Sequence, residues 1–126
     1  MYRPPRVLIV DDDRDNREAY AEYLRFRGFE IDEADTGAKA VEQALRLNPD
    51  LVLLDMRLPD IDGAEVSRRL HTHAHRPRII ALSACVFSED VEAALASGCD
   101  HFLAKPCLPE TLEAELLRIL HADRLS

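Results

Sequence analysis

The sequence predicts an α/β domain with one parallel sheet and helices on both of its faces. Short apolar runs alternate with longer stretches of helical spacing, and this alternation occurs five times in 126 residues. Alternating β and α segments are typical of parallel sheets with right-handed crossovers. The apolar runs are nearly continuous, which suits strands that are covered on both faces. A chain of this length is expected to form a single domain, residues 1–126.

Five segments are expected to be strands. Four of them are almost wholly apolar, whereas the segment 29–34 has apolar residues only at 29, 31 and 34. That polarity indicates an edge of the sheet, because an edge strand is less completely covered. The four apolar strands are expected at residues 7–10, 51–54, 79–82 and 102–104.

A helix is expected after each strand, since apolar residues recur there at helical spacing and capping residues stand at the ends. The expected helices run from about residue 14 to 27 before Gly28, from the cap Thr36 to Asn48, from near Gly63, from the cap Ser88 to Gly98, and from Pro109 onward. Their apolar stripes are expected to include Ala19, Tyr20, Tyr23, Leu24, Leu45, Val66, Leu70, Leu95 and Leu117.

Composition and charge exclude several classes of protein. Lys and Arg total 16 and Asp and Glu total 24, so the net charge is −8. Such an acidic chain is a poor binder of a nucleic acid backbone, and metal cations or basic protein surfaces suit it better. No apolar run approaches the roughly 18 residues of a membrane span, and no signal peptide is visible. We therefore expect a cytoplasmic protein without direct nucleic acid or membrane contacts.

Ionisable or hydroxyl side chains follow four of the five expected strands. Three aspartates (11–13) follow the first strand, Asp55 follows the third, Ser83 the fourth and Lys105 the fifth. Ligands bind at the carboxyl ends of strands in open parallel sheets, so these positions are candidates for a site. Carboxylates about 4 Å apart repel by about 4 kcal/mol at an effective dielectric near 20. We therefore predict that a cation gathers them, and carboxylate oxygens suit Mg²⁺.

The residues opposite the acids suit phosphoryl chemistry. The chain has only two lysines, Lys39 and Lys105, and one of them stands at a strand end. Its ammonium group suits a phosphoryl oxygen, and the hydroxyl of Ser83 can donate a hydrogen bond to another. Asp55 is the natural nucleophile for an acyl phosphate, because the third strand holds it.

Each of these residues also has a structural interpretation. The aspartates 11–13 could cap the following helix, and Asp55 could form a turn. Ser83 could be a structural hydroxyl and Lys105 a surface charge. Their joint occurrence at strand ends favours a functional site over these separate explanations.

Two further groups of residues have less specific patterns. His71, His73 and His75 could bind a transition metal if they formed a strand, but they follow a helix, which favours a solvated loop. Cys99 has no CxxC partner, and Cys85 and Cys107 stand two residues after Ser83 and Lys105. Reduced thiols that pack in the fold are expected at all three cysteines, with a redox role as the alternative.

These residues together resemble the receiver domain of bacterial two-component response regulators, over essentially the whole chain. The motifs are Val10-Asp11-Asp12, the segment 53–59 around Asp55 with the later Gly63, Ser83-Ala84, and Lys105-Pro106. The resemblance implies a flavodoxin-like (βα)5 fold whose five-stranded parallel sheet has the order 2-1-3-4-5.

The resemblance also implies a role for each motif residue. Asp12 and Asp55 would bind Mg²⁺ directly, Asp11 through water, and Arg57 through its backbone carbonyl. Asp55 would accept a phosphoryl group from the phosphohistidine of a histidine kinase or phosphotransfer protein. Ser83 and Lys105 would hold the phosphoryl oxygens.

Two positions are implied to modify this behaviour. Phe102 stands where the family has a switch aromatic, commonly tyrosine, and it lacks the hydroxyl that would form the usual hydrogen bond. Arg57 and Cys85 stand at positions that tune dephosphorylation in the family.

The expected function is a two-state switch rather than an enzyme, with phosphorylation changing the affinity of a surface for a downstream protein. That surface is formed by the fourth helix, the fifth strand and the fifth helix, and a monomer or weak dimer is expected. The alternatives are a phosphorylation-independent interaction module of the same fold and an aspartate-nucleophile phosphohydrolase. A free-standing regulator is expected because no residue run follows the fifth helix. The isomer of the bond before Pro106 stays open.

Overall fold

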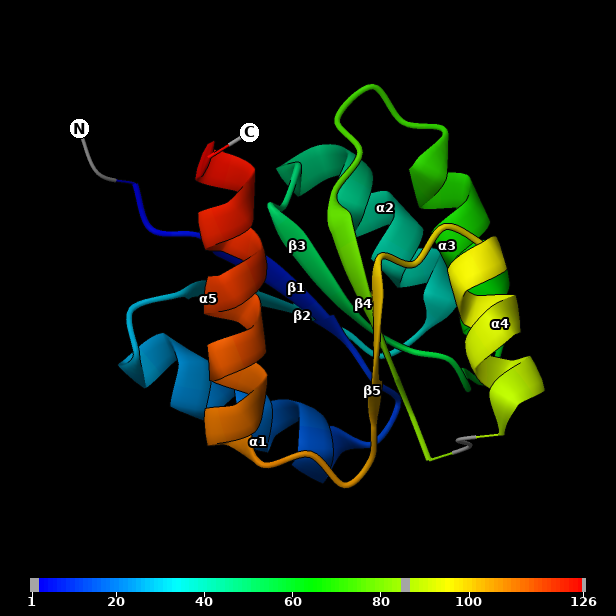
Figure 1. Ribbon diagram of the computed structural model, residues 1–126, viewed down its shortest axis with the longest axis horizontal. Helices are drawn as coiled ribbons and strands as arrows, with labels where there is room; N and C mark the ends of the chain where they lie inside the picture. Colours follow the sequence, from blue (N-terminus) through cyan, green and yellow to red (C-terminus); the bar gives the residue numbers. More distant parts are fainter. Residues whose placement is uncertain (1–2, 85–86, 126) are drawn as a thin grey trace.

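The sheet has five parallel strands in the order β2-β1-β3-β4-β5 (Figure 1), as predicted. The computed structural model describes residues 3–84 and 87–125. The strands are β1 (Arg6–Val10), β2 (Glu30–Ala34), β3 (Leu51–Asp55), β4 (Arg78–Ser83) and β5 (His101–Ala104). The helices are α1 (Arg14–Phe26), α2 (Gly37–Leu47), α3 (Gly63–His71), α4 (Ser88–Ala96) and α5 (Pro109–Leu125). The weak strand β2 lies at an edge, as its polarity predicts.

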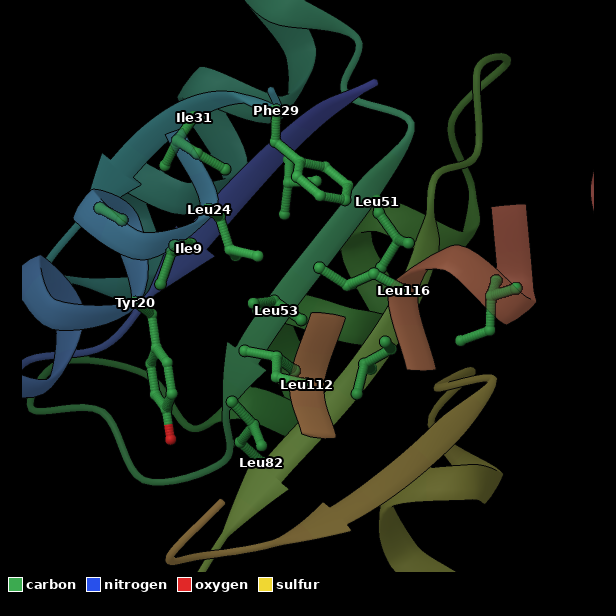
Figure 2. Close-up of a cluster of buried hydrophobic side chains, with 14 residues drawn as sticks. Ile9, Tyr20, Leu24, Phe29, Ile31, Leu51, Leu53, Leu82, Leu112 and Leu116 are labelled. Atoms are coloured by element: carbon green, nitrogen blue, oxygen red, sulfur yellow. The ribbon is translucent and has the colours of Figure 1, made fainter. Parts of the chain in front are cut away.

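The core has two halves, one on each face of the sheet. Successive residues of a strand point to opposite faces, so Val7 and Ile9 enter one half and Leu8 and Val10 the other. Helices α1 and α5 cover the first half (Figure 2), and α2, α3 and α4 cover the second. All four of these β1 residues are at most 1% exposed. The nearly continuous apolar runs therefore reflect burial on both faces.

The helix ends agree with the predictions at α2 and differ at α4. Thr36 caps α2 by accepting a hydrogen bond from the N–H of Lys39 at 3.2 Å. The prediction of Ser88 as the cap of α4 is wrong, because the helix already begins at Ser88 and Phe87 stands at the cap position. A side chain can cap only from the non-helical position before the first turn, so the one-residue difference removes that role.

Several predicted core residues lie at the surface instead. Ala19 is exposed and Ala21 is buried in its place. Leu45, Leu95 and Leu117 are 50%, 46% and 49% exposed. Spacing of three and four residues marks a stripe on a helix, but packing against the sheet covers only part of that stripe. Among the described residues, no helix has the length and apolarity needed to cross a membrane.

The loop between β3 and α3 is tied to the start of α2. The carboxylate of Asp60 accepts hydrogen bonds from the N–H groups of Gly37 at 2.8 Å and Ala38 at 2.9 Å. Gly37 permits this approach, because a Cβ atom there would collide with the side chain of Ile61. Hydrogen bonds from the backbone N–H groups of Ala38, Gly37 and Ile61 lower the pKa of Asp60 to about 2. The ionised carboxylate thus stabilises the folded state.

We expect the substitution Asp60→Ala to lower the melting temperature at pH 7, because two N–H groups at the start of α2 lose their acceptor. The folded-state pKa of Asp60 is depressed from 3.8 to about 2. The contribution of ionised Asp60 to the free energy of unfolding is therefore complete above its ordinary pKa, and it is lost as the pH falls toward 2. Thermal unfolding followed by circular dichroism between pH 7 and pH 2 measures this difference.

The control for this prediction is Glu42→Ala, which removes an exposed acid within α2 itself. We expect it to change the melting temperature much less than Asp60→Ala at pH 7. An Asp60→Ala deficit that remained constant down to pH 2 would show that the carboxylate charge is not the cause.

Candidate functional site

Three carboxylates meet at the carboxyl ends of β1 and β3. One oxygen each of Asp11, Asp12 and Asp55 can be chosen so that all three lie within 4.8 Å of one another. The register explains the meeting, since Val10 pairs with Leu54 and the next residue of each strand is an aspartate. Asp11 is 3% and Asp55 8% exposed, whereas Asp12 is exposed. The cluster is therefore anchored in the sheet and open on one side.

Local hydrogen bonds hold Asp11 in place. Its N–H donates to the carbonyl of Ala34 at 3.1 Å, and its Oδ1 accepts from the N–H of Asp13 at 2.9 Å. Its own carbonyl accepts a hydrogen bond from Nη1 of Arg17 at 2.8 Å. These bonds fix the direction in which the first carboxylate of the cluster points.

The three aspartates after β1 are divided between two tasks. Asp13 is the N-cap of α1, and its side chain accepts a hydrogen bond from the N–H of Asn16 at 3.1 Å. The capping interpretation therefore holds for this aspartate. Asp11 and Asp12 belong to the carboxylate cluster instead.

Lys105, which directly follows β5, bridges two of the carboxylates. Its Nζ lies 3.1 Å from Oδ2 of Asp11 and 3.0 Å from Oδ2 of Asp55. Its backbone N–H donates to the carbonyl of Ser83 at 2.9 Å, and its peptide bond to Pro106 is cis. The site thus combines one ammonium group, which contacts two of the carboxylates, with a third carboxylate, and this excess of acidic groups suits a divalent cation.

The environment shifts the pKa values of the bridged pair. Burial raises the pKa of Asp55, while the N–H of Arg57 at 2.9 Å from Oδ1 and the ammonium of Lys105 partly oppose this. Burial lowers the pKa of Lys105, but hydrogen bonds to Asp55 and Asp11 outweigh it and leave the pKa raised. Lys105 thus stays charged, and ionised Asp55 is held at an energetic cost.

Ser83 and Lys105 extend the site beyond Asp55, along the edge of the sheet at which the strands end. Ser83 is the last residue of β4, is 3% exposed, and pairs in register with Ala104, the residue before Lys105. Asp55 pairs in register with Leu82. The ends of β3, β4 and β5 therefore present Asp55, Ser83 and Lys105 in spatial order.

A small cavity lies beside this row. It has a volume of about 190 Å³, and its lining includes Met56, Arg57, Ser83, Ala94 and Phe102. The half-buried ring of Phe102 packs against the core under α2, α3 and α4. The predicted switch position is thus adjacent to Ser83, and its ring has no hydroxyl to donate.

The remaining candidates of the sequence analysis lie away from the carboxylates. Within the described residues, the three aspartates form a group that could hold a metal ion, and the histidines form no such group. His71 is the last residue of α3, and His73 and His75 follow in the loop, as predicted. His71 lies against Gly98, where a Cβ atom would be 2.7 Å from its Nδ1.

The described cysteines have little thiolate character. Burial raises the pKa of the Cys99 thiol, which lies 3.5 Å from Oγ of Ser67, and burial also raises the pKa of Cys107. Both are free thiols. Cys85 lies outside the described residues.

Sequence reasoning missed three residues that support the site. Arg17 donates a hydrogen bond to the carbonyl of Asp11. Asp60 ties the loop after β3 to α2. The hydroxyl of Tyr20 donates to the carbonyl of Cys107. Helical spacing gives a signal for Tyr20 only as a core residue. Its hydrogen bond depends on a segment 87 residues away in the sequence.

Comparison with known proteins gives consistent similarities. A family model described as the response regulator receiver domain matches residues 7–117. The response regulator MprA of Mycobacterium leprae (strain TN) is 36% identical over 119 residues, which cover 94% of this chain and 52% of that protein. The transcriptional regulatory protein PrrA of the same organism is 36% identical over 116 residues, covering 92% and 50%. The chain thus spans about half the length of these curated relatives.

Solved structures show the same likeness. A CheY-like response regulator receiver domain protein from Methanospirillum hungatei JF-1 superposes with a TM-score of 0.92 at 26% identity, covering 97% of this chain and 98% of that chain. The chemotaxis response regulator CheY4 of Vibrio cholerae superposes with a TM-score of 0.88 at 27% identity, covering 93% and 99%.

Proposed function

This chain belongs to the response regulator receiver domain family, and from that premise we propose that it is a switch operated by phosphorylation of Asp55. The phosphoryl donor is the phosphohistidine of a histidine kinase or a phosphotransfer protein. The observation that carries the proposal is the bridge from Lys105 to Asp11 and Asp55, beside Asp12 at the open edge of the sheet. Burying polar and charged groups costs free energy, so a purely structural role gives no reason for four ionisable side chains at one point.

The transfer exchanges one bond for another. The P–N bond of the phosphohistidine breaks, and a P–O bond forms to a carboxylate oxygen of Asp55. The electron pair of the broken bond stays on the imidazole nitrogen, which takes up a proton. Asp55 suits the nucleophilic role because it ends a strand that is buried on both faces and because the N–H of Arg57 orients its carboxylate.

The residues around Asp55 have separate tasks in this proposal. Lys105 offers its ammonium group to a phosphoryl oxygen, and Ser83 offers its hydroxyl to another. Asp11, Asp12, Asp55 and the backbone carbonyl of Arg57 would hold Mg²⁺, whose hard-oxygen preference the three carboxylates satisfy. When bound, Mg²⁺ supplies positive charge that neutralises the phosphoryl oxygens during transfer.

The output is a change of the surface formed by α4, β5 and α5. Phosphorylation adds negative charge and acceptor oxygens, which draw Ser83 and Lys105 from the ends of β4 and β5. Exposed apolar side chains on or beside this surface support a protein target. They are Phe87 at 71%, Leu95 at 46%, Leu108 at 67% and Leu117 at 49% exposure. The protein is thus proposed as a signalling phosphoacceptor without turnover of a separate substrate.

Incubation with acetyl phosphate and Mg²⁺ tests this function. We expect intact-protein mass spectrometry to find one added phosphoryl group per chain, and a chelator to prevent its addition. Acetyl phosphate serves as the phosphoryl donor in place of a phosphohistidine, so the test does not require the kinase. Continuous release of phosphate without accumulation of the modified protein would instead indicate a phosphohydrolase. Target binding that does not change with acetyl phosphate would indicate an interaction module.

A further inference from the structure

A hydrogen bond connects α1 to the segment that follows β5. The hydroxyl of Tyr20 donates to the backbone carbonyl of Cys107 at 2.7 Å. The ring of Tyr20 is 9% exposed and belongs to the core cluster under α1 and α5. Figure 2 shows its hydroxyl directed away from Ile9 and Leu24 of that cluster. Tyr20 therefore combines an apolar core contact with a polar contact to a distant segment.

The two ends of this hydrogen bond belong to elements that supply the site. Helix α1 follows the aspartates of the cluster, and Cys107 stands two residues after Lys105. The N–H of Lys105 is tied to the carbonyl of Ser83 at 2.9 Å, which fixes the segment before the lysine. Pro106 has no N–H to donate, so the segment after Lys105 has one fewer backbone donor with which to anchor itself.

A cavity beside this segment explains why a polar contact matters there. Its volume is about 440 Å³, and its lining includes Asn16, Ala19, Tyr20, Lys105 and Pro106. Close packing alone therefore does not hold the segment against α1 over this stretch. Burial raises the pKa of Tyr20, so its hydroxyl remains protonated and available as a donor.

We propose that Tyr20 is a positioning residue for Lys105, because its hydroxyl holds the segment 105–107 so that the ammonium group stays between Asp11 and Asp55. This inference rests on the proposed function for its effect on phosphorylation. The contacts of Tyr20 and Lys105 exist before phosphorylation, so the positioning of Lys105 can be measured without phosphoryl transfer.

The matched pair of substitutions is Tyr20→Phe and Tyr23→Phe. The hydroxyl of Tyr23 also leaves α1 and donates a hydrogen bond, at 2.9 Å to Oε1 of Glu113 on α5. Each substitution removes one hydroxyl and leaves the ring. We expect Tyr20→Phe to slow phosphorylation by acetyl phosphate by about threefold to tenfold, the worth of one hydrogen bond, and Tyr23→Phe to leave the rate within about twofold.

A double-mutant cycle with Lys105→Met tests the same coupling through the free energy of unfolding, without Mg²⁺ or phosphate. We expect Tyr20→Phe and Lys105→Met to be non-additive, and Tyr23→Phe and Lys105→Met to be additive. Additive effects in the first pair, or equal phosphorylation rates for the two tyrosine variants, would overturn the inference. If the wild-type chain takes up no phosphoryl group, the proposed function fails, and the cycle still decides whether Tyr20 positions Lys105.

Discussion

Replacing Asp55 by asparagine is expected to abolish the uptake of a phosphoryl group and, at the same time, to raise the stability of the metal-free protein at pH 7. An amide is not a nucleophile for phosphoryl transfer, so no acyl phosphate can form at this position. Asparagine has nearly the same shape as aspartate, so the fold is expected to be kept. Mass spectrometry after incubation with acetyl phosphate and Mg²⁺ measures the first effect.

The gain in stability follows from the pKa of Asp55, which burial raises above its ordinary value of 3.8. An acid whose pKa is raised in the folded state binds protons more tightly there than in the unfolded chain. The stabilisation of the folded state by protonated Asp55 is therefore fully present below the ordinary pKa. It is lost as the pH rises through the folded-state pKa, because the buried carboxylate must then carry its charge. The higher melting temperature of Asp55→Asn is thus expected at neutral pH and is expected to disappear below about pH 4.

The control is Asp13→Asn in the same part of the molecule. Asp13 caps α1 and lies outside the carboxylate cluster, and asparagine caps a helix about as well as aspartate. We expect this variant to take up one phosphoryl group like the wild-type chain. Equal labelling of Asp55→Asn and wild-type protein would refute the assignment of the phosphoacceptor.

Lys105→Met is expected to have opposite effects on phosphoryl transfer and on metal binding. The substitution removes the ammonium group that lies 3.1 Å from Asp11 and 3.0 Å from Asp55. Phosphoryl uptake is expected to fall because a phosphoryl oxygen loses its cationic partner. The affinity for Mg²⁺ is expected to rise, since the ammonium group no longer competes for the same two carboxylates.

The stability of this variant should depend on the metal. Without Mg²⁺, removal of one partner of a partly buried ion pair leaves like charges together and is expected to cost about 2–3 kcal/mol. The side chain of Lys105 is only 17% exposed, so water can compensate for little of this loss. Saturating Mg²⁺ is expected to restore most of the stability. Chemical denaturation with and without Mg²⁺ measures both values.

The other lysine of the chain provides the control. Lys39 is 58% exposed and pairs with Asp35 on the surface, so Lys39→Met is expected to change stability by less than about 1 kcal/mol. Its phosphorylation and metal affinity are expected to match those of the wild-type chain. A Lys105→Met variant whose Mg²⁺ affinity fell below that of the wild-type chain would contradict the competition between ammonium and metal.

The strands and the place of the site depend on features that are local in the sequence, whereas the full strand order was predicted from the family resemblance. Each apolar run predicts a buried strand, and the polar segment 29–34 predicts the edge strand β2. Because parallel strands end on the same edge of a sheet, residues directly after the runs are brought together whatever the details of packing. For this reason Asp11, Asp55 and Lys105 could be placed in one site from the sequence alone.

Only the tertiary structure decided which of several equivalent residues has which partner. It assigned Asp13 to a helix cap and Asp11 to the bridge with Lys105, and it joined Tyr20 to Cys107. It also left Leu45, Leu95 and Leu117 half exposed. Periodicity determines the direction of a side chain relative to its own helix or strand. Which distant group lies in that direction depends on the relative placement of whole elements, and no local pattern encodes that distance.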